Sequence, residues 1–126
     1  MIIGIGLDVL EVGRIKRVLK RWGDRFLKRM LGPTEIEYCR RHKDIAPYVA
    51  VRIAAKEAFF KATGLGLAGG MTWREAIVER ETGGKPYLRL SGKAAKVVKQ
   101  LKVDKIHLTL SHADTIASAV VILEKS

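Results

Sequence analysis

The sequence predicts an α+β domain in which helices pack on a largely antiparallel sheet, and three features of the chain lead to this prediction. Its first ten residues form an almost continuous apolar run, which is typical of a buried strand. Between about Glu11 and Thr63, apolar residues recur at spacings of three and four, the period of helices. From Ala76 onward, short apolar or alternating runs return, separated by turn residues. Separate strand and helix segments of this kind are the pattern of an α+β domain.

The N-terminal half should hold one strand and three helices. Gly4 and Gly6 suit a strand whose backbone is closely approached by another group, and this strand is expected to end near Asp8. A long amphipathic helix should follow and stop at Gly32 and Pro33. The three expected helices extend from about Glu11 to that stop, from an N-cap at Thr34 to about Arg41, and from about Pro47 to Thr63.

The C-terminal half should hold a hairpin, a helix and two strands. The runs 76–80 and 86–90 flank the turn sequence ETGGK, which is the pattern of a β-hairpin. Ser91 is the expected cap of the next helix, and the runs KIHLTLSH and ASAVVIL predict the last two strands. The predicted order is therefore strand, three helices, two strands, one helix and two strands.

Length and composition limit the kinds of protein that this chain can be. Its 126 residues suit a single domain, residues 1–126, and a hydrophobic content of 48% excludes a disordered chain. It contains no run of about 18 apolar residues that could span a membrane. Because the start has no basic leader and Cys39 is the only cysteine, a reducing, cytoplasmic location is expected.

The chain is strongly basic, with 24 Lys and Arg against 13 Asp and Glu and a net charge of +11. Such a charge attracts nucleic acid, an anionic membrane, an acidic protein or phosphorylated ligands. The excess is concentrated in residues 14–29, where eight of sixteen positions are basic and only Asp24 is acidic. A solvated helix face usually mixes charges of both signs, so this segment is expected to face a partner.

Several common catalytic motifs are absent. The glycine-rich GLGLAGGMTW lacks the lysine of a P-loop, and GIGLDV is too short for a dinucleotide-binding motif. Ser111 and His112 are neighbours on an expected strand and point to opposite faces, so they do not by themselves make a nucleophile and base. The histidines and the single cysteine have no zinc-binding spacing. A P-loop site, a serine hydrolase and a zinc site are therefore not predicted.

Two acids stand in apolar surroundings, Asp8 at the end of the first strand and Glu57 within the third helix. In one interpretation Asp8 caps the next helix, and Glu57 forms an i,i+4 pair with Lys61 worth about 0.2–0.5 kcal/mol. In the other, both acids bind Mg²⁺, which takes one or two protein carboxylates and completes its shell with water and phosphates. Lys61, Arg52 and Lys56, all near Glu57, would then contact the phosphates.

Two further residues have both an ordinary and a functional interpretation. His112 ends an expected strand beside a turn, where it is either a structural histidine or a ligand contact. Lys85, in the turn sequence GGKP, is either a solvated turn residue or a ligand contact. Their positions in the sequence leave both interpretations open.

Four segments of the chain match a known family in the expected order. They are GIGLDVLEVGRI, RIAAKEAFFKATGLG, GKPYLRLSGKA and HLTLSHADTIASAVVILE, and together they extend over nearly the whole chain. With these segments the chain resembles the holo-acyl-carrier-protein synthases, the small class of 4′-phosphopantetheinyl transferases. The specific part of the resemblance is G-[IL]-D near the start with A-K-E-A-F-x-K-A about fifty residues later.

The resemblance implies the 4′-phosphopantetheinyl transferase fold and an activity in support of fatty acid biosynthesis. The phosphopantetheine arm of coenzyme A would be transferred to a serine of apo acyl carrier protein, with release of adenosine 3′,5′-bisphosphate. Asp8 and Glu57 would bind the cofactor Mg²⁺ together with the pyrophosphate of coenzyme A. Mg²⁺ and Lys61 would stabilise the negative charge that develops on the transferred group, so all three residues would be catalytic.

The resemblance leaves two details of this chemistry open. Some larger relatives have a third carboxylate two positions after the aspartate, where this chain has Leu10, so a water would complete the metal shell. The serine proton would pass to Glu57 through a metal-bound water or to Asp8, with Glu35 as a weaker candidate.

The resemblance also implies two binding surfaces and an oligomeric state. Coenzyme A would contact Arg52, Lys61, Gly64, Lys85, Pro86, Ser111 and His112. The acidic carrier protein would dock on Arg14, Val18, Arg21, Trp22, Arg25 and Phe26, which combine basic and apolar side chains. Small members of the family are typically homotrimers with active sites between subunits. His112 would then serve a site whose Asp8 and Glu57 belong to a neighbouring chain.

Three other functions fit parts of the pattern. The basic helix suits a nucleic-acid-binding module, but it has no aromatic stacking platform and the chain has no RNP or zinc-finger motif. A purely structural oligomer would not require Asp8, Glu57 and Lys61 together. Another coenzyme A enzyme on the same scaffold is the third. Neither nucleic acid nor a membrane is therefore an expected partner.

Overall fold

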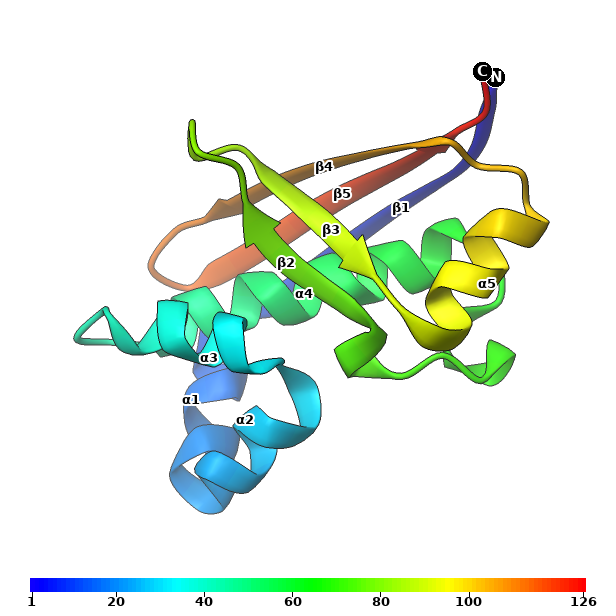
Figure 1. Ribbon diagram of the computed structural model, residues 1–126. Helices are drawn as coiled ribbons and strands as arrows, with labels where there is room; N and C mark the ends of the chain where they lie inside the picture. Colours follow the sequence, from blue (N-terminus) through cyan, green and yellow to red (C-terminus); the bar gives the residue numbers. More distant parts are fainter.

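One long helix packs against a three-stranded antiparallel sheet in the computed structural model, which describes all 126 residues (Figure 1). Figure 1 shows a separate two-stranded hairpin in front of this helix. The larger sheet contains β1 (Ile2–Glu11), β5 (Ile116–Glu124) and β4 (Lys105–His112) in that order, the hairpin contains β2 (Ala76–Arg80) and β3 (Pro86–Leu90), and the long helix is α4 (Ala46–Ala62). The predicted α+β class with mainly antiparallel strands is confirmed.

Two glycines allow β1 and α4 to touch through their backbones. A Cβ atom on Gly6 would lie 1.8 Å from the carbonyl oxygen of Ala58, and one on Gly4 would lie 1.9 Å from that of Ala62. Neither space can hold a side chain, because both obstacles are main-chain atoms of the helix. The expectation that another group approaches this strand closely is confirmed, and the group is α4.

The first strand is longer than predicted. It continues past Asp8 to Glu11, because β5 pairs with it along this whole length and places Ala119 opposite Asp8. Asp8 is therefore an interior strand residue on the buried face, with 7% of its surface exposed. The alternate residues Ile5 and Leu7 lie on the opposite face and are exposed.

The basic segment forms two helices instead of the single one predicted. Gly23 separates them, with a left-handed φ of 51° that favours glycine, and its backbone N–H caps the first helix by donating to the Leu19 carbonyl. The chain therefore has four helices before the hairpin. They are α1 (Val12–Trp22), α2 (Asp24–Met30), α3 (Pro33–Arg40) and α4.

The short third helix begins earlier than expected. Its N-cap is Gly32 and not Thr34, since Pro33 already occupies the first helical turn. The Glu35 side chain accepts a hydrogen bond from the Gly32 N–H at 2.9 Å, which satisfies a donor at the helix start. The hydroxyl of Thr34 instead donates to Glu79 at the surface.

The remaining elements follow the prediction closely. Ser91 occupies the N-cap position of α5 (Gly92–Gln100), although its side chain makes no capping hydrogen bond. The glycine-rich loop after α4 contains two short 3₁₀ helices, η1 (Gly66–Gly69) and η2 (Trp73–Glu75). No helix of the structure has both the length and the apolar character needed to cross a membrane.

A buried ion pair joins α3, α4 and the start of β2. The Lys56 and Glu35 side chains are both fully buried, and Lys56 Nζ lies 2.8 Å from Glu35 Oε1. Lys56 also donates to the carbonyl oxygens of Trp73 and Ala76, while the second carboxylate oxygen of Glu35 accepts from the Val78 N–H. Neither residue can reach a ligand. Lys56 as a phosphate contact and Glu35 as a base were therefore wrong predictions.

Candidate active site

Asp8 and Lys61 form the first contact of the candidate site. The Lys61 ammonium donates to Asp8 Oδ1 at 2.9 Å and to the Leu7 carbonyl at 3.2 Å, which links the end of α4 to β1. The Asp8 side chain is 8% exposed and that of Lys61 is 57% exposed. The hydrogen bond that Lys61 donates to Asp8 raises the pKa of Lys61. A charged amine is therefore held at the edge of a buried carboxylate and still faces solvent.

The interpretation of Glu57 and Lys61 as an i,i+4 salt bridge is wrong. Lys61 forms its ion pair with Asp8, and no ion pair joins it to Glu57. Asp8 does not cap α1 either, because the N-cap position belongs to Glu11, three residues further along β1. Asp8, Glu57 and Lys61 do lie together, but the ion-pair partner of Lys61 is Asp8 from the strand.

Glu57 lies beside Asp8, and the pKa of its carboxyl group is raised to about 7. Burial is the main cause, followed by a hydrogen bond to Asp8 and by the negative charge of Asp8. The positive charges of Lys61 and Arg14 oppose this shift of the pKa but do not cancel it. Two carboxyl groups in one partly buried space cannot both ionise without a cost in free energy.

One oxygen of this acid pair lacks a partner. Asp8 Oδ2 is buried and has no hydrogen-bond partner as long as Glu57 carries no proton. A proton on Glu57 or a bound cation would satisfy it. The donor set fits Mg²⁺, which needs only one or two protein carboxylates when phosphates and waters supply the other ligands. No group of three or more Asp, Glu, His or Cys that could hold a metal ion is present.

The acid pair opens into a cavity of about 350 Å³ beside α1. Its polar lining comes from Asp8, Glu57 and Arg14, and its walls are mainly apolar. The walls include Val9, Leu10, Ile15, Val18, Phe26, Met30, Ile53 and Trp73. Trp73 was not predicted as a site residue, because it follows the glycine-rich loop and is brought to the cavity only by folding.

The predicted carrier-binding residues lie next to this cavity. Val18 and Phe26 line both this cavity and a neighbouring one of about 470 Å³, whose lining also includes Trp22 and Arg25. Trp22 is 47% exposed, and the guanidinium groups of Arg21 and Arg25 lie 5.2 and 5.6 Å from the centroid of its ring. An exposed aromatic side chain flanked by cations therefore stands at the corner between α1 and α2.

Arg52 lies in a different place from the acid pair. It is 1% exposed, donates to the Tyr48 carbonyl and stacks on the Tyr38 ring at 4.2 Å. Its Nε atom is buried without a hydrogen-bond partner. Arg41 and Arg80 also approach the Tyr38 ring, at 6.0 and 5.3 Å. Three guanidinium groups thus gather at one end of a cavity of about 450 Å³.

Sequence reasoning missed three residues of this arginine cluster. Tyr38 and Arg41 lie three positions apart at the end of α3, so helical spacing could have placed them on one side. Arg80 comes from the hairpin, and no local pattern connects it to α3. The predicted contacts Lys85 and Pro86 lie at the turn of that hairpin, beside Gly84, which lines the same cavity.

The last predicted coenzyme A contacts lie elsewhere in the chain. His112 ends β4 and packs against Tyr48 with 5.1 Å between ring centroids, in a cavity that Asp8 and Glu57 do not line. Ser111 precedes it on the strand and is exposed. Gly64 follows α4 with a φ of 79° and is also exposed. A single chain therefore does not bring all the predicted contacts together.

We expect the Glu57 carboxyl to titrate near pH 7 in the metal-free protein. Because this pKa is raised above the ordinary 4.5, the protonated group contributes stability that is fully present below about pH 4.5. That contribution is lost as the pH rises through about 7. Asp8→Asn removes a negative charge, so the pKa of Glu57 should fall part of the way toward 4.5. Carboxyl NMR titrations of both proteins measure this, and an unchanged pKa in Asp8→Asn would leave burial as its only cause.

The sequence and the α+β architecture place the chain in a family of transferases. The chain belongs to the 4′-phosphopantetheinyl transferase superfamily, whose family model matches residues 4–120. It is similar to the holo-[acyl-carrier-protein] synthase of Koribacter versatilis, with 47% identity over 124 residues that cover 98% of this chain and 99% of the relative. The family that the sequence motifs indicated is confirmed.

Solved structures of relatives agree with this result. The crystal structure of holo-[acyl-carrier-protein] synthase from Neisseria meningitidis matches with a TM-score of 0.91 and 33% identity, over 99% of this chain and 100% of that one. The synthase from Bacillus anthracis, crystallised in complex with CoA (3′,5′-ADP), matches with a TM-score of 0.82 and 34% identity, over 100% and 99% of the two chains. The predicted fold is therefore confirmed at the level of the family.

Proposed function

We propose that this chain is a Mg²⁺-dependent holo-[acyl-carrier-protein] synthase. It transfers the 4′-phosphopantetheine arm of coenzyme A to a serine of apo acyl carrier protein, which yields the holo protein and adenosine 3′,5′-bisphosphate and supports fatty acid biosynthesis. The observation that carries the proposal is the Asp8–Glu57 pair, with one unpartnered buried oxygen and Lys61 beside it, in a chain of this family. The cytoplasm is the proposed location, in keeping with a single free cysteine.

Asp8 and Glu57 would hold the magnesium ion. When bound, Mg²⁺ supplies positive charge against the pyrophosphate of coenzyme A and polarises the phosphoryl group that is attacked. Asp8 Oδ2 is buried without a hydrogen-bond partner, and this supports the assignment, because a bound cation would satisfy it. The raised pKa of Glu57 means that a proton competes with the cation for the site near neutral pH.

Lys61 would assist transfer directly. Its ammonium group is anchored by Asp8 and the Leu7 carbonyl, yet more than half of the side chain is open to solvent. A fixed cation of this kind stabilises the charge that develops on the leaving oxygen. With Glu35 buried in its pair with Lys56, the serine proton has two candidate acceptors, Glu57 and Asp8.

Coenzyme A would be held by charged groups away from the acid pair. We assign a phosphate of coenzyme A to the arginine cluster around Tyr38, because the Arg52 Nε is a buried donor without an acceptor. Lys85 and Pro86, at the hairpin turn beside this cluster, would contact the nucleotide. Ser111, His112 and Gly64 complete the proposed set, with His112 acting on the site of a neighbouring subunit.

A homotrimer would bring these separate groups together. The support for such an assembly is the outer face of the three-stranded sheet, which is apolar and exposed. The side chains that stand out on it are Ile5 (63% exposed), Leu7 (56%) and Val9 (57%). An exposed apolar patch of this kind is typical of a surface that another chain covers.

The carrier protein would dock on the corner of α1 and α2. The guanidinium groups of Arg14, Arg21 and Arg25 would attract an acidic partner. Between them, the side chains of Val18, Trp22 and Phe26 offer an apolar surface. Arg14 also lines the cavity of the acid pair, so a carrier bound here has its serine close to Asp8 and Glu57.

The proposal is tested by mass spectrometry of the carrier protein. Incubated with coenzyme A, Mg²⁺ and an apo acyl carrier protein, the chain should add one phosphopantetheine to each carrier. Removal of Mg²⁺ with a chelator should stop the reaction, and added Mg²⁺ should restore it. No mass shift with several apo carriers would overturn the proposed function.

A further inference from the structure

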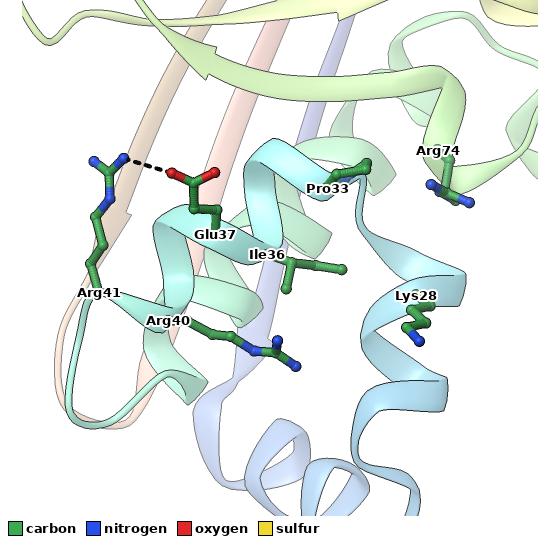
Figure 2. Close-up of a pocket in the computed structure, with 7 residues that line it drawn as sticks. All are labelled: Lys28, Pro33, Ile36, Glu37, Arg40, Arg41 and Arg74. Carbon is green, nitrogen blue, oxygen red and sulfur yellow. Dashed lines mark hydrogen bonds and ion pairs between the residues drawn. The ribbon is translucent and has the colours of Figure 1, made fainter.

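A second basic groove lies on the far side of α2 from the proposed carrier-docking corner. Figure 2 shows its walls, which come from α2, α3 and η2. The groove has a volume of about 620 Å³, which is larger than the cavity of the acid pair, at about 350 Å³. It is lined by Lys28, Pro33, Ile36, Glu37, Arg40, Arg41 and Arg74.

The charges in this groove are only partly neutralised within the chain. Arg41 pairs with Glu37 at 3.2 Å, and Arg40 pairs with Asp24 at the surface. Lys28 and Arg74 are exposed and form no ion pair. Two free cations therefore remain, and a negatively charged partner would satisfy them.

The arrangement of the cations suits an extended acidic segment better than a single phosphate. In Figure 2, Lys28 and Arg74 stand on one side of the groove, and Arg40 reaches toward it from the other. Arg41 is turned away toward Glu37. Ile36 and Pro33 lie between the charged walls and offer apolar contact. Separated cations around an apolar strip complement a polypeptide that carries both acidic and apolar side chains.

Two elements, η2 and α2, border both the groove and the candidate active site. In η2, Trp73 lines the cavity of Asp8 and Glu57, and the next residue, Arg74, lines the groove. In α2, Phe26 lines that cavity while Lys28 lines the groove. A bound protein that spans α2 would therefore contact both the candidate active site and the groove.

We propose that this groove is a second docking site for the carrier protein. It receives an acidic segment of the same carrier molecule whose serine lies at Asp8 and Glu57. The inference rests on the proposed function for the identity of the acidic partner. It adds Lys28 and Arg74 to the carrier-binding surface, beyond the residues of α1 and the α1–α2 corner.

The test is direct binding of a fluorescently labelled apo acyl carrier protein, measured by anisotropy without coenzyme A. In the double variant Lys28→Glu and Arg74→Glu, the Kd should rise about tenfold at low salt, because attraction is replaced by repulsion. High salt should remove most of this difference. The matched control is Lys96→Glu with Lys99→Glu on α5, which makes the same change of charge at exposed positions that do not line the groove. Its Kd should stay within about twofold of the wild type.

The outcomes separate this inference from the proposed function. Equal Kd values for the groove variant and the control would overturn the second docking site, even if the wild type modifies the carrier normally. Groove-dependent binding without any phosphopantetheine transfer would support the docking site and overturn the proposed activity. A groove variant with an unchanged Kd for the carrier and a raised KM for coenzyme A would assign the groove to phosphate and contradict the inference.

Discussion

Glu57→Gln should lower phosphopantetheine transfer by at least about 100-fold, because it removes a proposed ligand of the magnesium ion that polarises the reacting group. The amide is the same size as the carboxyl group, so the packing of α4 should be kept. It cannot supply the negative charge that the proposed magnesium site needs, nor accept the serine proton. The measurement is the initial rate of carrier modification at saturating coenzyme A and Mg²⁺, with circular dichroism to show that the fold remains.

Two comparisons make the Glu57 result specific. Asp104→Asn removes one negative charge at an exposed position near the C-terminus, where it accepts hydrogen bonds from Ser126, and should leave the rate nearly unchanged. Mg²⁺ binding measured by calorimetry should be weakened in Glu57→Gln and kept in Asp104→Asn. Turnover of Glu57→Gln close to that of the wild type would remove Glu57 from the catalytic site.

Lys56→Met should lower the free energy of unfolding by about 3–5 kcal/mol, since it leaves the buried Glu35 charge without its partner. Burial lowers the pKa of Lys56, and the Glu35 charge opposes this shift of the pKa, so the two groups depend on each other. Chemical denaturation followed by tryptophan fluorescence measures the loss. Breaking an exposed pair should cost far less, so Arg41→Met, which loses its exposed contact with Glu37 and its approach to the Tyr38 ring, should change the stability by less than about 1 kcal/mol.

A double variant identifies the source of this loss. Adding Glu35→Gln to Lys56→Met removes the unpaired charge, so it should recover part of the lost stability. The amide can still accept a hydrogen bond from the Gly32 or Val78 N–H that Glu35 now satisfies. A double variant that is less stable than Lys56→Met alone would mean that the carboxylate contributes through its backbone contacts and not through its charge.

The acid pair could be predicted from the sequence because each member stands out in its own segment. Asp8 and Glu57 interrupt apolar runs, and an acid in such a position needs a partner or a ligand. The sequence also predicted that Lys61 lies beside them, but the i,i+4 interpretation paired it with Glu57 and not with Asp8. The i,i+4 rule describes an isolated helix, and it does not include a strand that lies close enough to offer Asp8 instead.

The other charges of α4 show where this reasoning stops. Arg52 and Lys56 carry the same kind of charge as Lys61, so the sequence gives no reason to treat them differently. The fold separates them, because α4 is covered on several sides and Lys61, near its C-terminal end, is its only exposed residue. Lys56 faces the carboxylate of Glu35 from α3, while Arg52 faces the ring of Tyr38, which also lies in α3. Such partners come from tertiary contacts that local spacing does not contain.

The break at Gly23 was missed for a similar reason. The apolar residues keep a helical spacing through Trp22 and Phe26, so periodicity predicts one continuous helix. A glycine within a helical pattern is often tolerated, and only its left-handed backbone in the structure shows that it turns the chain. This turn creates α2, and with it both the exposed corner at Trp22 and the groove beyond it.

The contact between β1 and α4 has a consequence for how the enzyme family can vary. Asp8 lies two residues after Gly6 in the strand, and Glu57 lies one residue before Ala58 in the helix. The separation of the two acids is therefore set by main-chain atoms that already touch, and not by the sizes of the side chains around them. Hydrophobic residues elsewhere in the core can be exchanged over evolution while the two carboxyl groups keep their spacing. A side chain at Gly4 or Gly6 would instead push β1 away from α4 and change this spacing.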